Sequence, residues 1–254
     1  MVKEGYIKSE THNGVTAIEF YHPQSNSLPS RLLEDLAQEI HSVAHDDDTR
    51  VIVLRSSGDK AFCAGASFEE LAAITTKEQG LEFFSGFANV INAMRKCPKP
   101  IIGRVHGKIV GGGVGLVAAT DYAIAVEGAD VKLSELSIGI GPFVIGPAVE
   151  RKIGTASFSY LALDASMWRN ADWAKRKGLY AELHPTIEGM DESVARLSNT
   201  LSHSSPQALA ELKKVFWKGT ENWDSLLLER AAISGRLVLS DFTRTAIERF
   251  KTKA

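Results

Sequence analysis

Three consecutive glycines near the middle of the chain constrain the fold more than any other feature. Gly111–Gly113 follow a short run of strand formers, Ile101–Val105, and precede small and apolar residues up to Thr120. This order predicts a strand that leads through a glycine loop into a helix beginning at Val114. Because glycine costs conformational entropy, three in a row indicate that another group approaches the backbone closely. The unpaired N–H groups at such a helix start favour negative charge, as an oxyanion site requires; a tight turn that lets the helix pack on a sheet is the alternative.

Length and composition limit the class of protein. The chain has 254 residues, enough to bury a substantial core as one domain or as one domain with an appendage. Its formal net charge is −2 and it has no long basic run, so we expect neither nucleic acid nor a membrane as a partner. We find no stretch of the roughly 20 apolar residues that span a bilayer and no signal-type apolar run. Cys63 and Cys97 match no metal or disulfide spacing, so we expect a reduced, cytoplasmic protein.

The order of the remaining elements predicts an α/β fold. Two runs rich in strand formers, Tyr6–His12 and Val15–Tyr21, are joined by an Asn-Gly pair, the dipeptide typical of a tight hairpin. Val51–Leu54 is a continuous apolar run, as expected for a strand covered on both faces, and Tyr122–Val126 repeats the theme. Ser30 is expected to cap a helix with one apolar face, formed by Leu32, Leu33, Leu36 and Ile40. The later helices gather toward the C-terminus.

A second loop is also rich in small residues. Gly58–Phe68 follows the strand that begins at Val51 and is almost uncharged after Lys60, so its backbone is available to a ligand. Two helices are expected next, Glu69–Ile74 and Glu82–Met94. The second has an apolar face that either belongs to the core or lines an apolar pocket, made of Phe83, Phe84, Phe87, Val90, Ile91 and Met94.

Several segments occur along the chain in the order found in one enzyme family. They are Phe62-Cys63-Ala64-Gly65-Ala66-Ser67, then Val105-His106-Gly107 with Gly111-Gly112-Gly113, then Leu133–Pro142, Ala171–Leu179 and Ser205-Pro206-Gln207-Ala208. Together they resemble the crotonase superfamily, the enoyl-CoA hydratase/isomerase family, over nearly the whole chain. Several motifs in the right order are more specific than a single glycine loop.

The resemblance implies a fold and a substrate class. The expected fold is α/β: a crotonase-like spiral of ββα units with an acyl-CoA site in residues 1–195, and a C-terminal helical region in residues 196–254 for trimerisation and closure of the site. The expected substrate is an acyl-CoA thioester, and the expected assembly is a homotrimer or a dimer of trimers. Coenzyme A would be part of the substrate, and no metal or other cofactor is expected.

The resemblance also implies roles for individual residues. The backbone N–H groups of Ala66 and Gly112 would form the oxyanion hole for the thioester oxygen, where enolate charge develops. Glu135 would be the catalytic base, with a pKa raised by partial desolvation among Leu133, Leu136 and Ile138. The substrate and its coenzyme A portion would contact further residues: Ser25, Ser27, Lys60, Ala64, Gly65, Ser67, Phe68, Gly111, Pro142, Phe143 and Lys253. Of these, Lys60 or Lys253 would lie near the phosphates, and Ser67 is interpreted mainly as capping its loop.

One departure from the family pattern bears on the reaction. Hydratases of this family commonly carry two glutamates, at the positions occupied here by Gly115 and Glu135. Adding water across a double bond benefits from two acid–base groups, whereas moving a double bond can use one. The Pro142-Phe143 pair is also similar to mitochondrial-type enoyl-CoA isomerases. We therefore expect an isomerase that converts a 3-enoyl-CoA into a 2-enoyl-CoA.

Other interpretations stay open. A hydratase remains possible if another carboxylate, from Glu69, Glu70 or Glu82, reaches the site, and a catalytically silent acyl-CoA-binding protein is the alternative from another class. The run from Gly113 to Ala118 also satisfies the loose dinucleotide fingerprint G-x-G-x-x-A. We disfavour that reading because the run does not lie in the first βαβ unit. We interpret His106 and Cys63 as structural residues.

Overall fold

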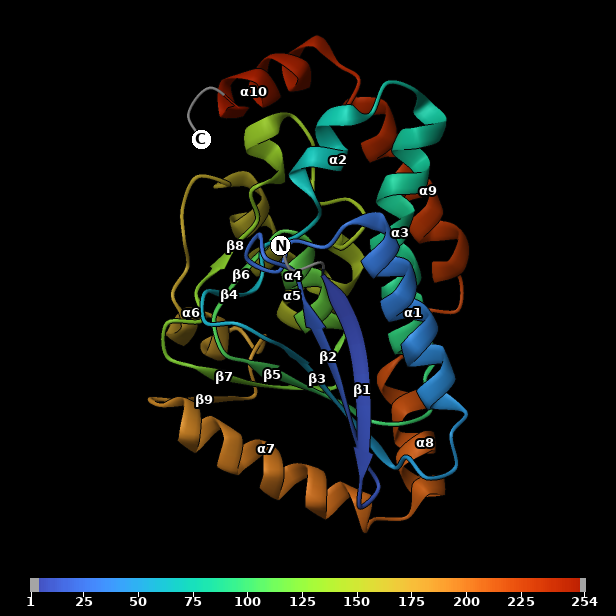
Figure 1. Ribbon diagram of the computed structural model, residues 1–254. Coiled ribbons are helices and arrows are strands. Elements are labelled where there is room, and N and C mark those ends of the chain that lie inside the picture. The colour runs from blue at the N-terminus through green and yellow to red at the C-terminus, as the bar shows by residue number, and fades with distance from the viewer. Residues whose placement is uncertain (1–4, 252–254) are drawn as a thin grey trace.

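The computed structural model describes residues 5–251, in which two β-sheets are surrounded by helices (Figure 1). The larger sheet has the strand order β1-β2-β3-β5-β7-β9 and the smaller one the order β4-β6-β8. The strands of the larger sheet are β1 (Tyr6–His12), β2 (Val15–Tyr21), β3 (Val51–Ser56), β5 (Ile101–Val105), β7 (Tyr122–Val126) and β9 (Glu182–His184). Those of the smaller sheet are β4 (Ala61–Cys63), β6 (Lys108–Val110) and β8 (Val131–Lys132).

The strand pairings confirm the predicted hairpin and the buried strands. β1 and β2 pair antiparallel, from Tyr6 opposite Tyr21 to His12 opposite Val15. The next pairs, from β2–β3 to β7–β9, are all parallel. The first four residues of β3 are buried, as a strand covered on both faces requires.

From β3 to β8, strands alternate between the two sheets along the chain, and helices follow each pair. β3 and β4 precede α2 (Phe68–Ala73) and α3 (Lys77–Lys96), and β5 and β6 precede α4 (Gly112–Ala119). β7 and β8 precede a 3₁₀ turn, η1 (Glu135–Ile138), and α5 (Gly146–Leu163). This repeat is the predicted spiral of ββα units, and it brings the ends of β4, β6 and β8 together.

The remaining helices cover the sheets. They are α1 (Ser30–Ala44), α6 (Ala171–Arg176), α7 (Ile187–Ser202), α8 (Pro206–Phe216), α9 (Trp223–Leu237) and α10 (Asp241–Lys251). α7 runs across strands of the larger sheet, whereas α1 lies beside α3 and contacts β1 and β2 (Figure 1). α9 packs along α3, so the C-terminal helical region contacts the spiral closely. The predicted division between residues 195 and 196 falls inside α7.

Three helices begin earlier than, or differently from, the sequence prediction. α1 begins at Ser30, with Pro29 as its N-cap, so the prediction that Ser30 caps the helix was wrong. The Ser30 hydroxyl instead donates a hydrogen bond to Glu70. α3 begins at Lys77, because a capping box of Thr76 and Gln79 adds a turn before the apolar face. α4 begins within the glycine triplet, at Gly112.

Within residues 5–251, no helix combines the length and the apolar character needed to cross a bilayer.

Candidate active site

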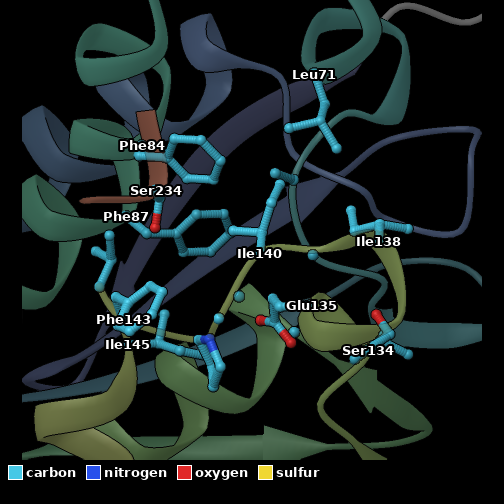
Figure 2. Close-up of a pocket in the computed structure, with 18 of the residues that line it drawn as sticks. Leu71, Phe84, Phe87, Ser134, Glu135, Ile138, Ile140, Phe143, Ile145 and Ser234 are labelled. Atoms are coloured by element: carbon cyan, nitrogen blue, oxygen red, sulfur yellow. The ribbon is translucent and has the colours of Figure 1, made fainter. Parts of the chain in front are cut away.

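A cavity of about 190 Å³ lies where the small sheet meets the start of α4. Its walls come from the loop between β4 and α2, from the glycine segment, from η1 with the loop after it, and from α3 and α9. The lining residues are mostly apolar (Figure 2): Ala64, Gly65, Ala66, Phe68, Leu71, Phe83, Phe84, Phe87, Val110, Gly111, Gly112, Ser134, Glu135, Ile138, Ile140, Gly141, Pro142, Phe143, Val144, Ile145 and Ser234. The engineered cavity that admits benzene has about 150 Å³, so this one accommodates a compact organic group.

Glu135 is the single ionisable side chain among these lining residues. It is the first residue of η1, and its Oε2 atom is buried without a hydrogen-bond partner in the described structure. Burial raises the pKa of Glu135 from 4.5 to about 7, against the smaller lowering effect of the backbone N–H groups of Glu135 and Ser134. A carboxylate with such a pKa is a competent general base near neutral pH.

The apolar surroundings of Glu135 differ from those expected from its neighbours in sequence. Leu133 is buried and Ile138 lines the cavity, but Leu136 is 44% exposed, so its predicted part in desolvating the carboxylate was wrong. The Glu135 side chain points into a cavity walled by Phe84, Phe87 and other apolar residues of distant segments (Figure 2). Desolvation therefore depends on the tertiary structure more than on the local sequence.

The absence of a side chain at Gly111 makes room for the Glu135 carboxylate. Gly111 has φ = 53°, in the region that favours glycine, and a Cβ atom there would lie 3.0 Å from Glu135 Oε1. The Gly111 N–H donates to Lys132 O at 2.9 Å, which ties the glycine segment to β8. The backbone thus passes close to the carboxylate, as the glycine triplet predicted.

Two cavity-lining residues, Ala66 and Gly112, have backbone N–H groups without an acceptor in the described structure. Gly112 is the first residue of α4, so its N–H has no partner within the helix, and Ala66 N–H likewise has no acceptor within residues 5–251. The Ala66 loop is fixed by hydrogen bonds from Leu28 N to Gly65 O at 2.7 Å and from Ser67 N to Leu28 O at 3.1 Å. A Cβ atom on Gly65 would lie 3.4 Å from Gly112 N, so the two loops are in contact.

All eight residues of α4 are buried, which explains its small and apolar composition. A Cβ atom on Gly112 would lie 2.2 Å from Phe87 Cζ, and one on Gly113 would lie 2.4 Å from Cys63 O. The run that matched a dinucleotide fingerprint is therefore packed on all sides, and its glycines serve helix packing and the cavity wall.

Ile145 occupies the space beside Gly115. A Cβ atom on Gly115 would lie 2.5 Å from Ile145 Cγ2 and 2.7 Å from Ile145 Cβ. A glutamate at position 115 would therefore clash with Ile145 as it now stands. The same loop places the ring of Phe143 against Gly141, where a Cβ atom would lie 2.5 Å from the ring. The space that the second glutamate of the family's hydratases would occupy is therefore filled here by the apolar side chain of Ile145.

The other predicted site residues fall into three groups. The cavity lining brings together Ala64, Gly65, Ala66, Phe68, Gly111, Gly112, Glu135, Pro142 and Phe143. Outside the lining, Ser67 caps α2 by accepting from Glu70 N, Ser25 and Ser27 lie in the turn before α1, and Lys60 is exposed. Lys253 lies outside the described residues.

The carboxylates considered as a replacement for the missing one do not line the cavity. Glu70 accepts hydrogen bonds from the backbone and hydroxyl of Ser30, at 2.8 and 2.7 Å. Glu69 and Glu82 border separate surface hollows on either side of α2. The hypothesis that one of the three completes the site gains no support.

Two further predictions concern reactive side chains. Cys63 is buried, and burial raises the pKa of its thiol to about 12, so it is a packing residue and not a nucleophile. The His106 ring packs edge-on toward Phe62, and burial lowers its pKa. Both observations agree with structural roles.

Two serines of the lining were missed from the sequence. Ser134 precedes Glu135, so its position in the acidic segment was an available signal. Ser234 lies in α9, about 100 residues after Glu135, and no local pattern marks it. Only the packing of α9 on α3 brings it to the cavity.

Comparisons with known proteins agree with this geometry. A family model described as Enoyl-CoA hydratase/isomerase matches residues 10–244, so the chain belongs to that family, the crotonase superfamily. A Bacillus subtilis protein named "Probable enoyl-CoA hydratase" is 27% identical, over 94% of this chain and 93% of its own.

Two further relatives are similar in sequence or structure. The peroxisomal Delta(3,5)-Delta(2,4)-dienoyl-CoA isomerase of Arabidopsis thaliana is 26% identical over 85% of this chain and 81% of its own. The crystal structure of an enoyl-CoA hydratase from Mycobacterium avium has a TM-score of 0.86 and 26% identity, over 97% of this chain and 96% of that one. The chain is thus an enzyme of this family with the crotonase fold.

Proposed function

We propose that the protein moves the double bond of a 3-enoyl-CoA to give the 2-enoyl-CoA. The observation that carries this proposal is the single carboxylate in the cavity lining, Glu135, with Ile145 in the place where a second one would stand. Moving a double bond needs a proton removed at one carbon and returned at another, and one carboxylate can do both. Hydration needs a water molecule to be oriented and deprotonated as well, for which two groups are better suited.

The proposed reaction begins with binding of the thioester oxygen at the two free N–H groups, those of Ala66 and Gly112. The Glu135 carboxylate removes a proton from C2, and the electron pair of that bond delocalises into a dienolate whose negative charge develops on the thioester oxygen. The fixed N–H donors and the N-terminal end of α4 stabilise this charge. Glu135 then returns the proton to C4, and the double bond forms between C2 and C3, so no atom is gained or lost.

Burial of Glu135 supports this role. The carboxyl group has a pKa of about 7, so a large share of the protein holds the base form at neutral pH while the acid form remains strong enough to reprotonate C4. The relative from Arabidopsis named as a dienoyl-CoA isomerase is also consistent with double-bond movement.

The rest of the substrate and the assembly complete the proposal. The coenzyme A portion would run along Ser25–Leu28 and Ala64–Phe68, with Lys60 or Lys253 near the phosphates. The protein would need no cofactor beyond coenzyme A in its substrate, and would act in the cytoplasm as a homotrimer or a dimer of trimers.

The test is incubation of the purified protein with matched 2-enoyl- and 3-enoyl-CoA substrates, with chromatography that resolves isomerised from hydrated products. We expect conversion of the 3-enoyl-CoA to the 2-enoyl-CoA and little hydration. Hydration as the main reaction would overturn the proposal in favour of a hydratase. Binding of both substrates without turnover would indicate an acyl-CoA-binding protein.

A further inference from the structure

The cavity wall opposite Glu135 carries one polar side chain, that of Ser234. The residue is only 1% exposed, yet it lines the cavity, and it lies beside Phe84 and Phe87 (Figure 2). Its backbone carbonyl accepts from Val238 N at 2.9 Å, but its hydroxyl has no hydrogen-bond partner within the described residues. An unpaired hydroxyl therefore faces the cavity from an otherwise apolar wall.

The position of Ser234 is fixed by an unusually close contact between two helices. A Cβ atom on Gly80 of α3 would lie 2.7 Å from Gly235 Cα, and one on Gly235 would lie 2.8 Å from Gly80 C. The backbones of α3 and α9 therefore touch beside Ser234, and α9 cannot rotate the hydroxyl away without separating from α3. The side chain is held at the wall by packing.

Two other buried helical serines, both in α7, satisfy their hydroxyl groups within the protein. The Ser198 hydroxyl donates to Val194 O, one turn earlier in α7, at 2.8 Å. The Ser193 hydroxyl donates to Glu182. Ser234 makes neither kind of bond, and it lines the cavity, where a ligand group can pair with its hydroxyl. Its partner is expected in the cavity.

We propose that Ser234 is a specificity-determining residue that recognises an oxygen atom, as a hydroxyl or carbonyl group, on the acyl chain of the substrate. The oxygen would lie beyond the reacting carbons, because Ser234 stands across the cavity from Glu135 (Figure 2). The cavity of about 190 Å³ suits a compact acyl group with such a substituent. This inference rests on the acyl-CoA binding of the proposed function, though not on which reaction follows.

A binding experiment tests the inference without requiring turnover. Dissociation constants are measured by calorimetry for hexanoyl-CoA and for its 4-, 5- and 6-hydroxy derivatives, with the wild type, Ser234→Ala and Ser198→Ala. At least one hydroxylated ligand is expected to bind the wild type about tenfold more tightly than hexanoyl-CoA. Ser234→Ala is expected to lose that preference and to bind hexanoyl-CoA as well as before, while Ser198→Ala keeps the preference.

The outcomes separate this inference from the proposed function. Equal binding of all four ligands by the wild type would overturn the role of Ser234 and leave the isomerase proposal intact. A Ser234→Ala variant that weakens all ligands alike would reduce the residue to a structural one, which also overturns the inference. If the wild type bound none of the ligands, the acyl-CoA proposal itself would fail.

Discussion

Replacement of Glu135 by glutamine keeps the shape of the side chain and removes the base. If Glu135 is the sole proton carrier, kcat/KM for a 3-enoyl-CoA falls by about 10²–10⁴-fold, the usual contribution of a general base. In the wild type, kcat/KM should rise with pH and level off above about pH 7, because the base form is required and the pKa is about 7.

The same substitution has a calculable effect on stability. The Glu135 carboxyl group ionises near 4.5 in the unfolded chain and near 7 in the folded one, because burial penalises its charge. The neutral acid therefore favours folding fully below about pH 4.5, and this contribution is lost as the pH rises through about 7. The full loss corresponds to about 3 kcal/mol in the free energy of unfolding. Glutamine has no charge to bury, so Glu135→Gln escapes this loss.

Urea denaturation of both proteins at pH 5 and pH 8, at a fixed protein concentration, measures the difference. From pH 5 to pH 8, the free energy of unfolding of Glu135→Gln should increase by about 2–3 kcal/mol relative to that of the wild type. Glu211, whose side chain is 70% exposed, supplies the control, since Glu211→Gln should change neither activity nor this difference. Near-full activity of Glu135→Gln, or a wild-type rate profile with its inflection near pH 4.5, would refute the assignment of the base.

Three further predictions follow from packing, charge and assembly. Gly115→Glu should lower the free energy of unfolding by about 1–3 kcal/mol, because a Cβ atom at this position would lie 2.5 Å from Ile145. In denaturant titrations the double variant with Ile145→Ala should recover stability, and it should hydrate 2-enoyl-CoA. A Gly115→Glu variant as stable as the wild type would contradict the clash. Asp121→Ala should lower the free energy of unfolding by about 3–5 kcal/mol in the same assay, because it removes the carboxylate 2.8 Å from the buried ammonium group of Lys213. A loss below about 1 kcal/mol would show that the ion pair is solvated. Light scattering at micromolar concentration should give a homotrimer or a hexamer, and a monomer would contradict the proposed assembly.

The sequence alone was sufficient for the features that local geometry controls. An Asn-Gly pair between two strand-forming runs predicted the hairpin, and continuous apolar runs predicted buried strands. The glycine triplet predicted a close approach of the backbone, which the structure shows as the contact between Gly111 and the Glu135 carboxylate. These features could be predicted from the sequence because turn type, strand burial and glycine conformation depend mainly on residues that are adjacent in the chain.

Helix starts were less predictable, because capping depends on which polar group finds the free N–H donors. The sequence favoured Ser30 as the cap, but its hydroxyl donates to Glu70 of α2, 40 residues away, and the helix begins at Ser30 itself, one residue earlier than the cap assignment required. The Thr76 and Gln79 capping box is local, but the prediction did not use it and placed the start of α3 at Glu82 instead of Lys77.

The chemistry of the site was decided by residues far apart in the chain. Sequence identified Glu135 but assigned its desolvation in part to Leu136, which is exposed; the apolar groups come instead from α3 and from the loop after η1. Gly115 signalled a missing carboxylate, whereas only the structure shows Ile145 filling its place. Ser234 reaches the cavity because two glycines let α9 touch α3. Sequence periodicity indicates which face of its own helix or strand a residue occupies. The groups that lie opposite that residue across a cavity are determined by how other elements pack.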